Sequence, residues 1–217
     1  MPPAKAGAIK IARNARQRMD GLDLMRTLAD RSVAAVFIDG QYRSVLDRQN
    51  YGDEGERGEI PQMDDAMMSR FVAEAGRILR SSGHLFLFID KYLLVSGKWH
   101  AWLPEITPMR EVDCQIWDKE RIGQGWRFRC RWEAMIVIQK GPVRADVWKL
   151  KDVPDVARAK ADRARHRHAK PVPMIEAAIR CVTEAGDIVV DPAAGSYTVL
   201  DACRSTGRVF IGCDIQG

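Results

Sequence analysis

Three segments of the chain place chemically capable side chains directly after an apolar run. Asp39-Gly-Gln-Tyr42 sets a carboxylate beside an aromatic ring. Asp191-Pro-Ala-Ala-Gly-Ser-Tyr197 is rich in small residues, which let a backbone approach a bound ligand closely. Asp214 follows the last apolar run. Ligands of an open α/β sheet bind at the carboxyl ends of its strands, so these three segments form the candidate functional site.

The second and third segments have the order expected of a nucleotide-binding unit. A helix that begins after 191–197 would offer backbone amide donors at its N-terminus. Asp214 lies about twenty residues further on, where an acid can accept hydrogen bonds from both hydroxyls of a ribose. The stretch lacks the G-x-G-x-x-G pattern of dinucleotide-binding proteins, so the sequence does not indicate NAD.

The hydrophobic pattern predicts the elements that position these segments. Segments of strand length predict strands at 33–38, 84–89, 112–117, 132–139, 187–191 and 209–212, and the continuous apolar runs at 33–38 and 85–89 indicate burial on both faces. Helical spacing of apolar residues predicts helices at 22–28, from Asp64 or Asp65 to Gly83, at 91–102, from Pro171 or Pro173 to Gly186, and at 198–205. Residues 40–62 are rich in glycine and charge and form a long loop. Strands that alternate with helices imply a doubly wound, mostly parallel α/β sheet covered on both faces.

Length and composition restrict the class of protein. The chain has 217 residues, 46% hydrophobic and 29% charged, which is typical of one globular domain. No apolar run approaches the roughly 20 residues of a membrane helix, and none follows the basic N-terminus as in a secretory signal. The five cysteines include no C-x-x-C pair. We therefore expect a cytoplasmic protein with reduced thiols, no metal site and no membrane contact.

Basic residues are concentrated in three stretches of a chain whose net charge is +5. These stretches are 1–18, 119–131 and 158–170, and each contains at most one acid. If the fold brings them together, they form one phosphate-binding face. Charge alone does not distinguish that face from three solvated basic segments.

The motifs of the first half resemble those of a known family, the DNA amino-methyltransferases, which modify N6 of adenine or N4 of cytosine with S-adenosylmethionine. Asp20-Gly-Leu-Asp-Leu24 and the stretch from Val33 to Tyr42 resemble the lead-in and the D-P-P-Y catalytic motif. Residues 113–141, with Ile116-Trp-Asp-Lys119 and Arg131-Trp-Glu133, resemble the region after the catalytic half.

The second half continues the resemblance. His166-Arg-His-Ala-Lys-Pro171 matches the motif H-P-x-x-K-P at its His, its Lys and its final Pro. Residues 186–196 resemble the cofactor loop, usually D-P-F-x-G-S-G, and residues 210–214 resemble the ribose-binding strand. The order of motifs is that of the group in which the catalytic motif precedes the cofactor motif.

The resemblance implies a Rossmann-like sheet with circularly permuted motif order, S-adenosylmethionine as cofactor and DNA as partner. The implied catalytic residues are Asp39, Gly40, Gln41 and Tyr42. The implied cofactor-binding residues are Asp191, Pro192, Ala193, Ala194, Gly195, Ser196, Tyr197, Asp214, His166, Lys170 and Pro171. The candidate nucleic-acid-binding residues are Arg121, Arg127, Arg129, Arg131, Arg163, Arg165 and Arg167. The expected organisation is a basic arm at 1–18, a catalytic half at 19–141, a short basic connector at 142–165 and a cofactor half at 166–217.

The implied mechanism is direct methyl transfer to a base that has left the duplex stack. Tyr42 would stack on that base, while Asp39 and the Gly40 carbonyl would accept hydrogen bonds from its amino group. No covalent intermediate is needed, so no cysteine has to act as a nucleophile. The D-x-x-Y form fits adenine N6 better than the S-P-P-Y form that is typical of cytosine N4.

The chain departs from the family pattern at several positions. Gly40 and Gln41 replace two prolines, and Ala193 replaces an aromatic residue that would contact the cofactor. Tyr197 replaces a glycine, so its ring would either supply the missing aromatic surface or crowd the pocket. These departures leave open an inactive DNA-binding protein of the same fold. A methyltransferase that acts on RNA or on a protein amide is a second alternative.

The sequence says least about which DNA target the protein recognises. Only residues 142–165 occupy the place where relatives with defined targets carry a recognition domain, so we expect a short or loose target preference. The sequence leaves open whether the protein acts as a monomer or a homodimer, and whether it serves in restriction–modification.

Overall fold

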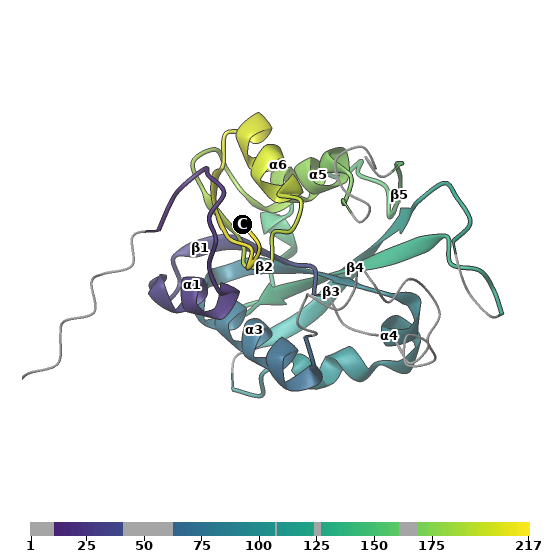
Figure 1. The fold of residues 1–217 in the computed structure, drawn as a ribbon, viewed down its shortest axis with the longest axis horizontal. Coiled ribbons are helices and arrows are strands. Elements are labelled where there is room, and N and C mark those ends of the chain that lie inside the picture. Colours follow the sequence, from purple (N-terminus) through teal and green to yellow (C-terminus); the bar gives the residue numbers. More distant parts are fainter. Residues whose placement is uncertain (1–10, 41–62, 107, 124–126, 161–168) are drawn as a thin grey trace, which may run out of the picture.

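The computed structural model of the protein describes residues 11–40, 63–106, 108–123, 127–160 and 169–217. Within these ranges the strands form one seven-stranded sheet in the order β5-β3-β4-β2-β1-β6-β7 (Figure 1). The strands are β1 (Val33–Ile38), β2 (Leu79–Ile89), β3 (Met109–Asp118), β4 (Trp132–Lys140), β5 (Val156–Arg158), β6 (Ile188–Asp191) and β7 (Val209–Gly212). Strand β4 is antiparallel to both of its neighbours, and every other pair is parallel. The sheet is therefore mostly parallel, as predicted.

Strand β1 lies inside the sheet and is buried along its whole length. Its side chains alternate between two apolar clusters, with Val36 and Ile38 in one and Ala35 and Phe37 in the other. Phe37 also stacks on Phe86 of β2, with ring centroids 4.6 Å apart. A strand that is buried on both faces needs an unbroken apolar sequence, which explains why 33–38 has no polar alternation.

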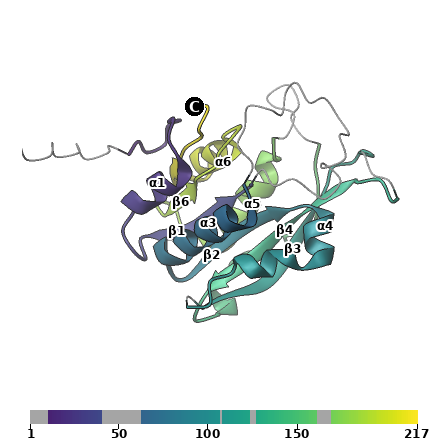
Figure 2. The ribbon, with the colours of Figure 1, turned by 60° about the horizontal axis from the view of Figure 1, so that its bottom comes forward.

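Helices cover both faces of the sheet (Figure 2). One face carries α1 (Gly21–Thr27), α3 (Asp65–Ile78), α4 (Lys91–Ser96) and the 3-10 helix η2 (Lys98–Trp102), and the other carries α5 (Val172–Val182) and α6 (Thr198–Thr206). A further 3-10 helix, η3 (Ala145–Val147), follows β4. Asp20, Asp64 and Asp90 begin α1, α3 and α4, because their carboxylates accept backbone N–H groups of the first turn. The predicted doubly wound architecture is confirmed.

Two predicted helix ends are wrong. Helix α3 ends at Ile78, since Leu79 takes an extended conformation and begins β2, so Gly83 lies inside that strand. A Cβ at Gly83 would come 3.0 Å from the carbonyl oxygen of Ala34, so this glycine permits close approach of two strands. Helix α5 ends at Val182, and Gly186 lies in the following turn with a φ of 85°.

The N-terminal segment 11–18 is attached to the sheet, so the prediction of a basic arm that extends to residue 18 is wrong for these residues. The backbone N–H of Asn14 donates to the carbonyl oxygen of Phe210 over 2.9 Å, and the Asn14 side chain accepts from the N–H of Phe210 over 2.8 Å. Arg18 forms a parallel bridge with Asp214. The segment thereby covers the edge strand β7, whose backbone groups would otherwise lack partners (Figure 1). Residues 1–10 lie outside the described ranges.

The connector 142–165 is also tied to the sheet. Its strand β5 pairs with β3 and forms the opposite edge. Three residues are too few to show a hydrophobic period, which is why the sequence predicted only a polar connector here. No helix in the described part of the chain is long and apolar enough to cross a membrane.

We predict that Gly21→Ala destabilises the protein because α1 lies directly against residue 192. A Cβ at Gly21 would lie 2.2 Å from the carbonyl oxygen of Pro192 and 2.8 Å from the ring of Phe71. Overpacking of this kind costs about 1–3 kcal/mol, which urea unfolding followed by circular dichroism would measure. Arg26→Ala, on the half-exposed side of the same helix, should stay within about 0.5 kcal/mol of the wild type. Equal stability of the two variants would contradict the close contact.

Candidate functional site

Three parallel strands bring the predicted site segments to one edge of the sheet. Strand β1 pairs with β6, and β6 pairs with β7, all in the same direction. Asp39 follows the end of β1, Asp191 is the last residue of β6, and Asp214 lies just beyond β7. The charges of Asp39 and Asp214 both act on the buried Asp191 carboxyl, which places the three acids near one another.

Asp191 differs from the other two acids because it is almost fully buried. Burial raises the pKa of its carboxyl to about 8, while a hydrogen bond from the Ala193 N–H, 3.2 Å from Oδ1, opposes the shift. The like charges of Asp39 and Asp214 raise it further. The raised pKa favours the protonated form of Asp191, and its hydrogen bond with the Ala193 N–H helps to shape the turn that follows β6.

The segment 191–197 is held beside the end of β7 by backbone hydrogen bonds. The Ala194 N–H donates to the carbonyl oxygen of Cys213 over 2.9 Å, and the Gly195 N–H donates to Oδ2 of Asp214 over 3.1 Å. Gly195 has a φ of 45°, and a Cβ added there would meet no atom within 4 Å. Open space thus lies over the glycine, next to a carboxylate that is partly exposed. These residues fit a ligand that carries hydroxyl groups.

Asp214 is fixed from both sides of the chain. Its Oδ1 accepts the Gln216 N–H over 2.8 Å, and its own N–H donates to the carbonyl oxygen of Gln17 over 3.2 Å. A carboxylate oxygen can accept more than one hydrogen bond, so these contacts orient the side chain and leave acceptor capacity.

Tyr197 does not offer a ring to a ligand, because its side chain is fully buried. Its hydroxyl donates to the carbonyl oxygen of Gln17 over 3.0 Å, and the Arg16 guanidinium lies 5.0 Å above the ring centroid. The ring therefore packs inside the protein instead of forming an exposed aromatic surface, and the cofactor-binding role of Tyr197 stays a prediction. The residue fastens the N-terminal segment to the start of α6, where its φ of 59° makes a left-handed turn.

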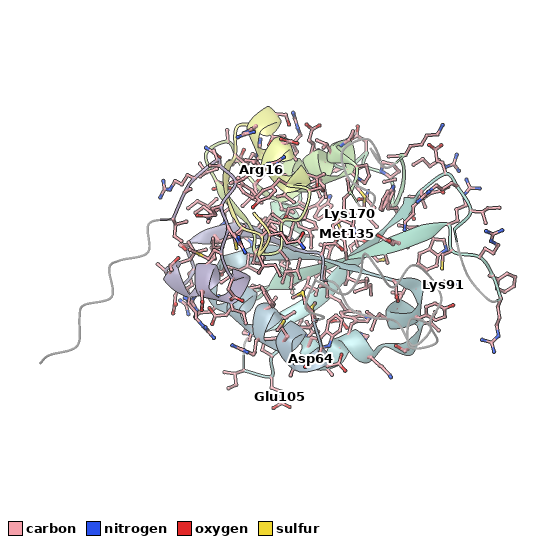
Figure 3. All side chains as sticks on the ribbon, viewed as in Figure 1. Arg16, Asp64, Lys91, Glu105, Met135 and Lys170 are labelled. Carbon is pink, nitrogen blue, oxygen red and sulfur yellow. The ribbon has the colours of Figure 1, made fainter. Side chains whose placement is uncertain are left out.

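Lys170 was expected to bind the cofactor, but its side chain contacts the predicted catalytic segment. Its Nζ lies 2.6 Å from Oδ2 of Asp39 and 3.2 Å from Oε2 of Glu133. Only 10% of the Lys170 side chain is exposed, and in Figure 3 it lies well inside the outline of the molecule, whereas Glu105 lies at the edge. The next residue, Pro171, begins α5 and so fixes where the Lys170 backbone lies.

Glu133 and Lys119 complete a row of alternating charges behind Asp39. Glu133 forms ion pairs with Lys170 and with Lys119. Burial by itself would raise the pKa of Glu133, but the two lysines lower it to about 2. Burial would lower the pKa of Lys170, but Asp39 and Glu133 raise it above the usual lysine value. Both side chains are therefore charged at every pH at which the protein would work.

Glu133 is a site residue whose role did not follow from the sequence, although one signal pointed to it. It is the single charged residue of the strand 132–139, whose other residues are apolar except Gln139, and a buried charge needs a partner. Which lysine supplies the partner depends on contacts between residues far apart in the chain.

Gly40 lies in a narrow space between β1 and α3. It is buried, and a Cβ there would lie 2.7 Å from Sδ of Met68 and 3.2 Å from Sδ of Met63. Six of the predicted site residues lie outside the described ranges: Gln41, Tyr42, Arg163, Arg165, His166 and Arg167.

The described arginines of the basic stretch 119–131 differ in how they are engaged. Arg131 forms a two-pronged ion pair with Asp118, at 2.8 and 3.0 Å, and Nε of Arg129 donates to the carbonyl oxygen of Gly123 over 2.8 Å. Arg121 and Arg127 are exposed. Phe128, next to Arg127, is 89% exposed as well. These exposed cationic and apolar side chains follow β3, which ends at the same sheet edge as β1 and β2 because β4 is antiparallel to both β2 and β3.

Comparison with known proteins supports a single family. The DNA methylase profile N6_N4_Mtase matches residues 119–217. The Type II methyltransferase M.HhaII of Haemophilus parahaemolyticus is 42% identical over 208 residues, which cover 93% of this chain and 91% of that protein. The DNA adenine methyltransferase YhdJ of Escherichia coli K12 is 36% identical over 74 residues, which cover 34% of this chain and 24% of that protein.

Solved structures share the fold at low sequence identity. TTHA0409, a DNA modification methylase from Thermus thermophilus, has a TM-score of 0.66 at 16% identity, over 92% of this chain and 88% of that one. The M1.HpyAVI complex with SAM has a TM-score of 0.64 at 17% identity, over 92% and 91%. The cytosine-N4-specific PvuII DNA methyltransferase has a TM-score of 0.68 at 13% identity, over 94% and 83%. Because M.HhaII is similar over nearly its whole length, the chain belongs to the N6/N4 family of DNA methylases.

Proposed function

We propose that the protein transfers a methyl group from S-adenosylmethionine to the exocyclic amino group of a DNA base, N6 of adenine. The observation that carries this proposal is the arrangement at the sheet edge. Asp39 lies after β1, while Gly195 and Asp214 lie across β6 from it, next to open space. An acceptor for an amino group and a site for a nucleoside cofactor are thus neighbours.

One set of residues would bind the cofactor, and another would bind the target base. When bound, S-adenosylmethionine supplies an electrophilic methyl group. Asp214 would accept hydrogen bonds from the ribose hydroxyls, and the small side chains around Gly195 would let the backbone approach the cofactor. Asp39 would accept a hydrogen bond from the target amino group and hold its nitrogen lone pair toward the methyl. Tyr42, outside the described ranges, keeps its predicted role as the ring on which the displaced base stacks.

The cysteines are consistent with transfer that involves no covalent enzyme intermediate. Burial raises the pKa of Cys181 to about 11 and the pKa values of Cys203 and Cys213 to about 12. A thiol must ionise to act as a nucleophile, so these three are inert at neutral pH.

The choice of adenine rests on the residue that opens the catalytic motif and on one relative. An Asp in this place, followed three residues later by Tyr, is typical of adenine enzymes, and YhdJ is a DNA adenine methyltransferase. The likeness to M.HhaII, a Type II methyltransferase, supports a role in restriction–modification.

We predict that DNA treated with the wild-type protein and S-adenosylmethionine yields N6-methyladenine on digestion to nucleosides and mass spectrometry. Asp39→Ala should abolish this product while cofactor affinity, measured by calorimetry, stays within a few-fold. N4-methylcytosine as the product would overturn the choice of base. Methylation of RNA alone, or binding without methylation, would favour one of the two other functions that the sequence left open.

We predict that Asp214→Ala weakens cofactor binding, because two hydrogen bonds to an ionised acceptor are lost. Each is worth on the order of 1.5–3 kcal/mol, so the loss of even one should lower the affinity by at least about tenfold. Calorimetric titration with S-adenosylmethionine would measure the change. Asp146→Ala, which removes an exposed acid paired with Arg144, is the control and should bind normally. Unchanged affinity in Asp214→Ala would place the ribose elsewhere.

We predict that phosphate contacts provide most of the DNA affinity, in keeping with the short connector. Replacement of both Arg121 and Arg127 by Ala should reduce the slope of log K against log salt by up to roughly two units, since each phosphate contact contributes about 0.9. All sequences should lose affinity alike. Arg26→Ala, on α1, should leave the slope unchanged.

A methylated motif of five or more fixed bases in a sequenced genome would contradict a short or loose target preference.

A further inference from the structure

The predicted cofactor residue Lys170 has contacts that suit a different task. Its ammonium group lies between two carboxylates, 2.6 Å from Asp39 Oδ2 and 3.2 Å from Glu133 Oε2. It also lies 5.0 Å from the ring centroid of Phe88 and 5.9 Å from that of Trp117. Two anions and two aromatic faces therefore fix the position of one nearly buried cation.

The Glu133 side chain, which contacts Lys170, is also held in place from its other side. Glu133 lies on β4, and Lys119, just after β3, holds its second side through an ion pair. The Lys119 ammonium lies 5.2 Å from the Trp117 ring centroid. Glu133 cannot turn away without breaking its ion pairs with both lysines, so it keeps Lys170 directed at Asp39.

Asp39 lies at a sheet edge that also carries Asp191 and Asp214. A cation in contact with a carboxyl favours its ionised form. Lys170 supplies the opposing positive charge, and its short contact restricts the rotation of the Asp39 side chain. Acceptance of a hydrogen bond from a base requires both an ionised carboxylate and a defined direction.

The ammonium group is unsuited to take a proton from the target amine. The carboxylates of Asp39 and Glu133 raise the pKa of Lys170 above that of an ordinary lysine, despite its burial. Its contribution must therefore come through Asp39 and not through proton transfer of its own.

We propose that Lys170, held by Glu133, is a positioning residue that orients and charges Asp39 for the target amino group. This proposal rests on the proposed methyl transfer. It assigns Lys170 to the catalytic half of the reaction, although the chain places it at the start of the cofactor half.

The test separates turnover from cofactor binding. Lys170→Met keeps most of the side-chain length and removes the charge, and it should lower kcat about 10²-fold, as expected for a misplaced reacting group. The dissociation constant of S-adenosylmethionine should stay within about threefold, because Asp214 and Gly195 are untouched. Glu133→Gln should lower kcat less, by about tenfold, since Asp39 still holds Lys170. Lys149→Met, which removes a lysine paired with Glu184 near α5, is the matched control and should have the wild-type kcat.

Folding is measured in parallel by thermal unfolding of each variant. Lys170→Met removes a cation from Asp39 and from Glu133, which keeps its ion pair with Lys119. The double variant Lys170→Met/Glu133→Gln serves if the single one does not fold. The double variant should have the kcat of Lys170→Met and not the product of two independent losses. A normal kcat in a folded Lys170 variant, or a loss of cofactor affinity as large as the loss of kcat, would overturn the positioning role. A wild-type protein that transfers no methyl group would instead refute the proposed function.

Discussion

The pairing of β1 with β6 is the constraint on which the site depends. These strands come from opposite ends of the chain, and their parallel register sets Ala35 beside Val189 and Val36 beside Val190. Because the two strands run the same way, the residues after each one emerge at the same edge. The buried apolar sequence of β1 makes the pairing stable, since its side chains fill the clusters on both faces of the sheet. The segment after β1 and the turn after β6 are therefore neighbours without any direct connection in sequence.

That edge carries three acids, and the fold surrounds each of them differently. Asp191 is buried so deeply that its pKa rises to about 8, which favours the protonated form. Asp214 stays near solvent and accepts backbone N–H groups of Gly195 and Gln216. Asp39 is paired with Lys170. Three similar residues thus have different surroundings, and the surroundings of Asp214 and Asp39 suit the roles proposed for them above.

The N-terminal segment contributes to the same edge. Gln17 accepts the Tyr197 hydroxyl and the Asp214 N–H at its carbonyl oxygen, and its side chain donates to the Gly212 carbonyl oxygen over 3.0 Å. The Met19 N–H donates to the carbonyl oxygen of Asp214 over 3.2 Å. Tyr197, a departure from the family pattern, is thereby explained as a packing residue. The segment acts as an additional edge partner for β7 and holds the loop 191–197 in its shape.

The sequence by itself determined the elements and the order of the motifs. Strand-sized segments rich in apolar residues predicted β1, β2, β3, β4, β6 and β7, and the unbroken run of β1 is what a strand buried on both faces requires. The same local signals placed Asp39, the segment 191–197 and Asp214 at strand ends. Local pattern could not predict β5, which has three residues, or the attachment of 11–18, which depends on the exposed edge of β7. Only the tertiary structure decided that Lys170 contacts Asp39 and that Tyr197 is buried. Both depend on long-range contacts, and a side chain's charge state and partner follow from what the fold sets beside it, not from its neighbours in the chain.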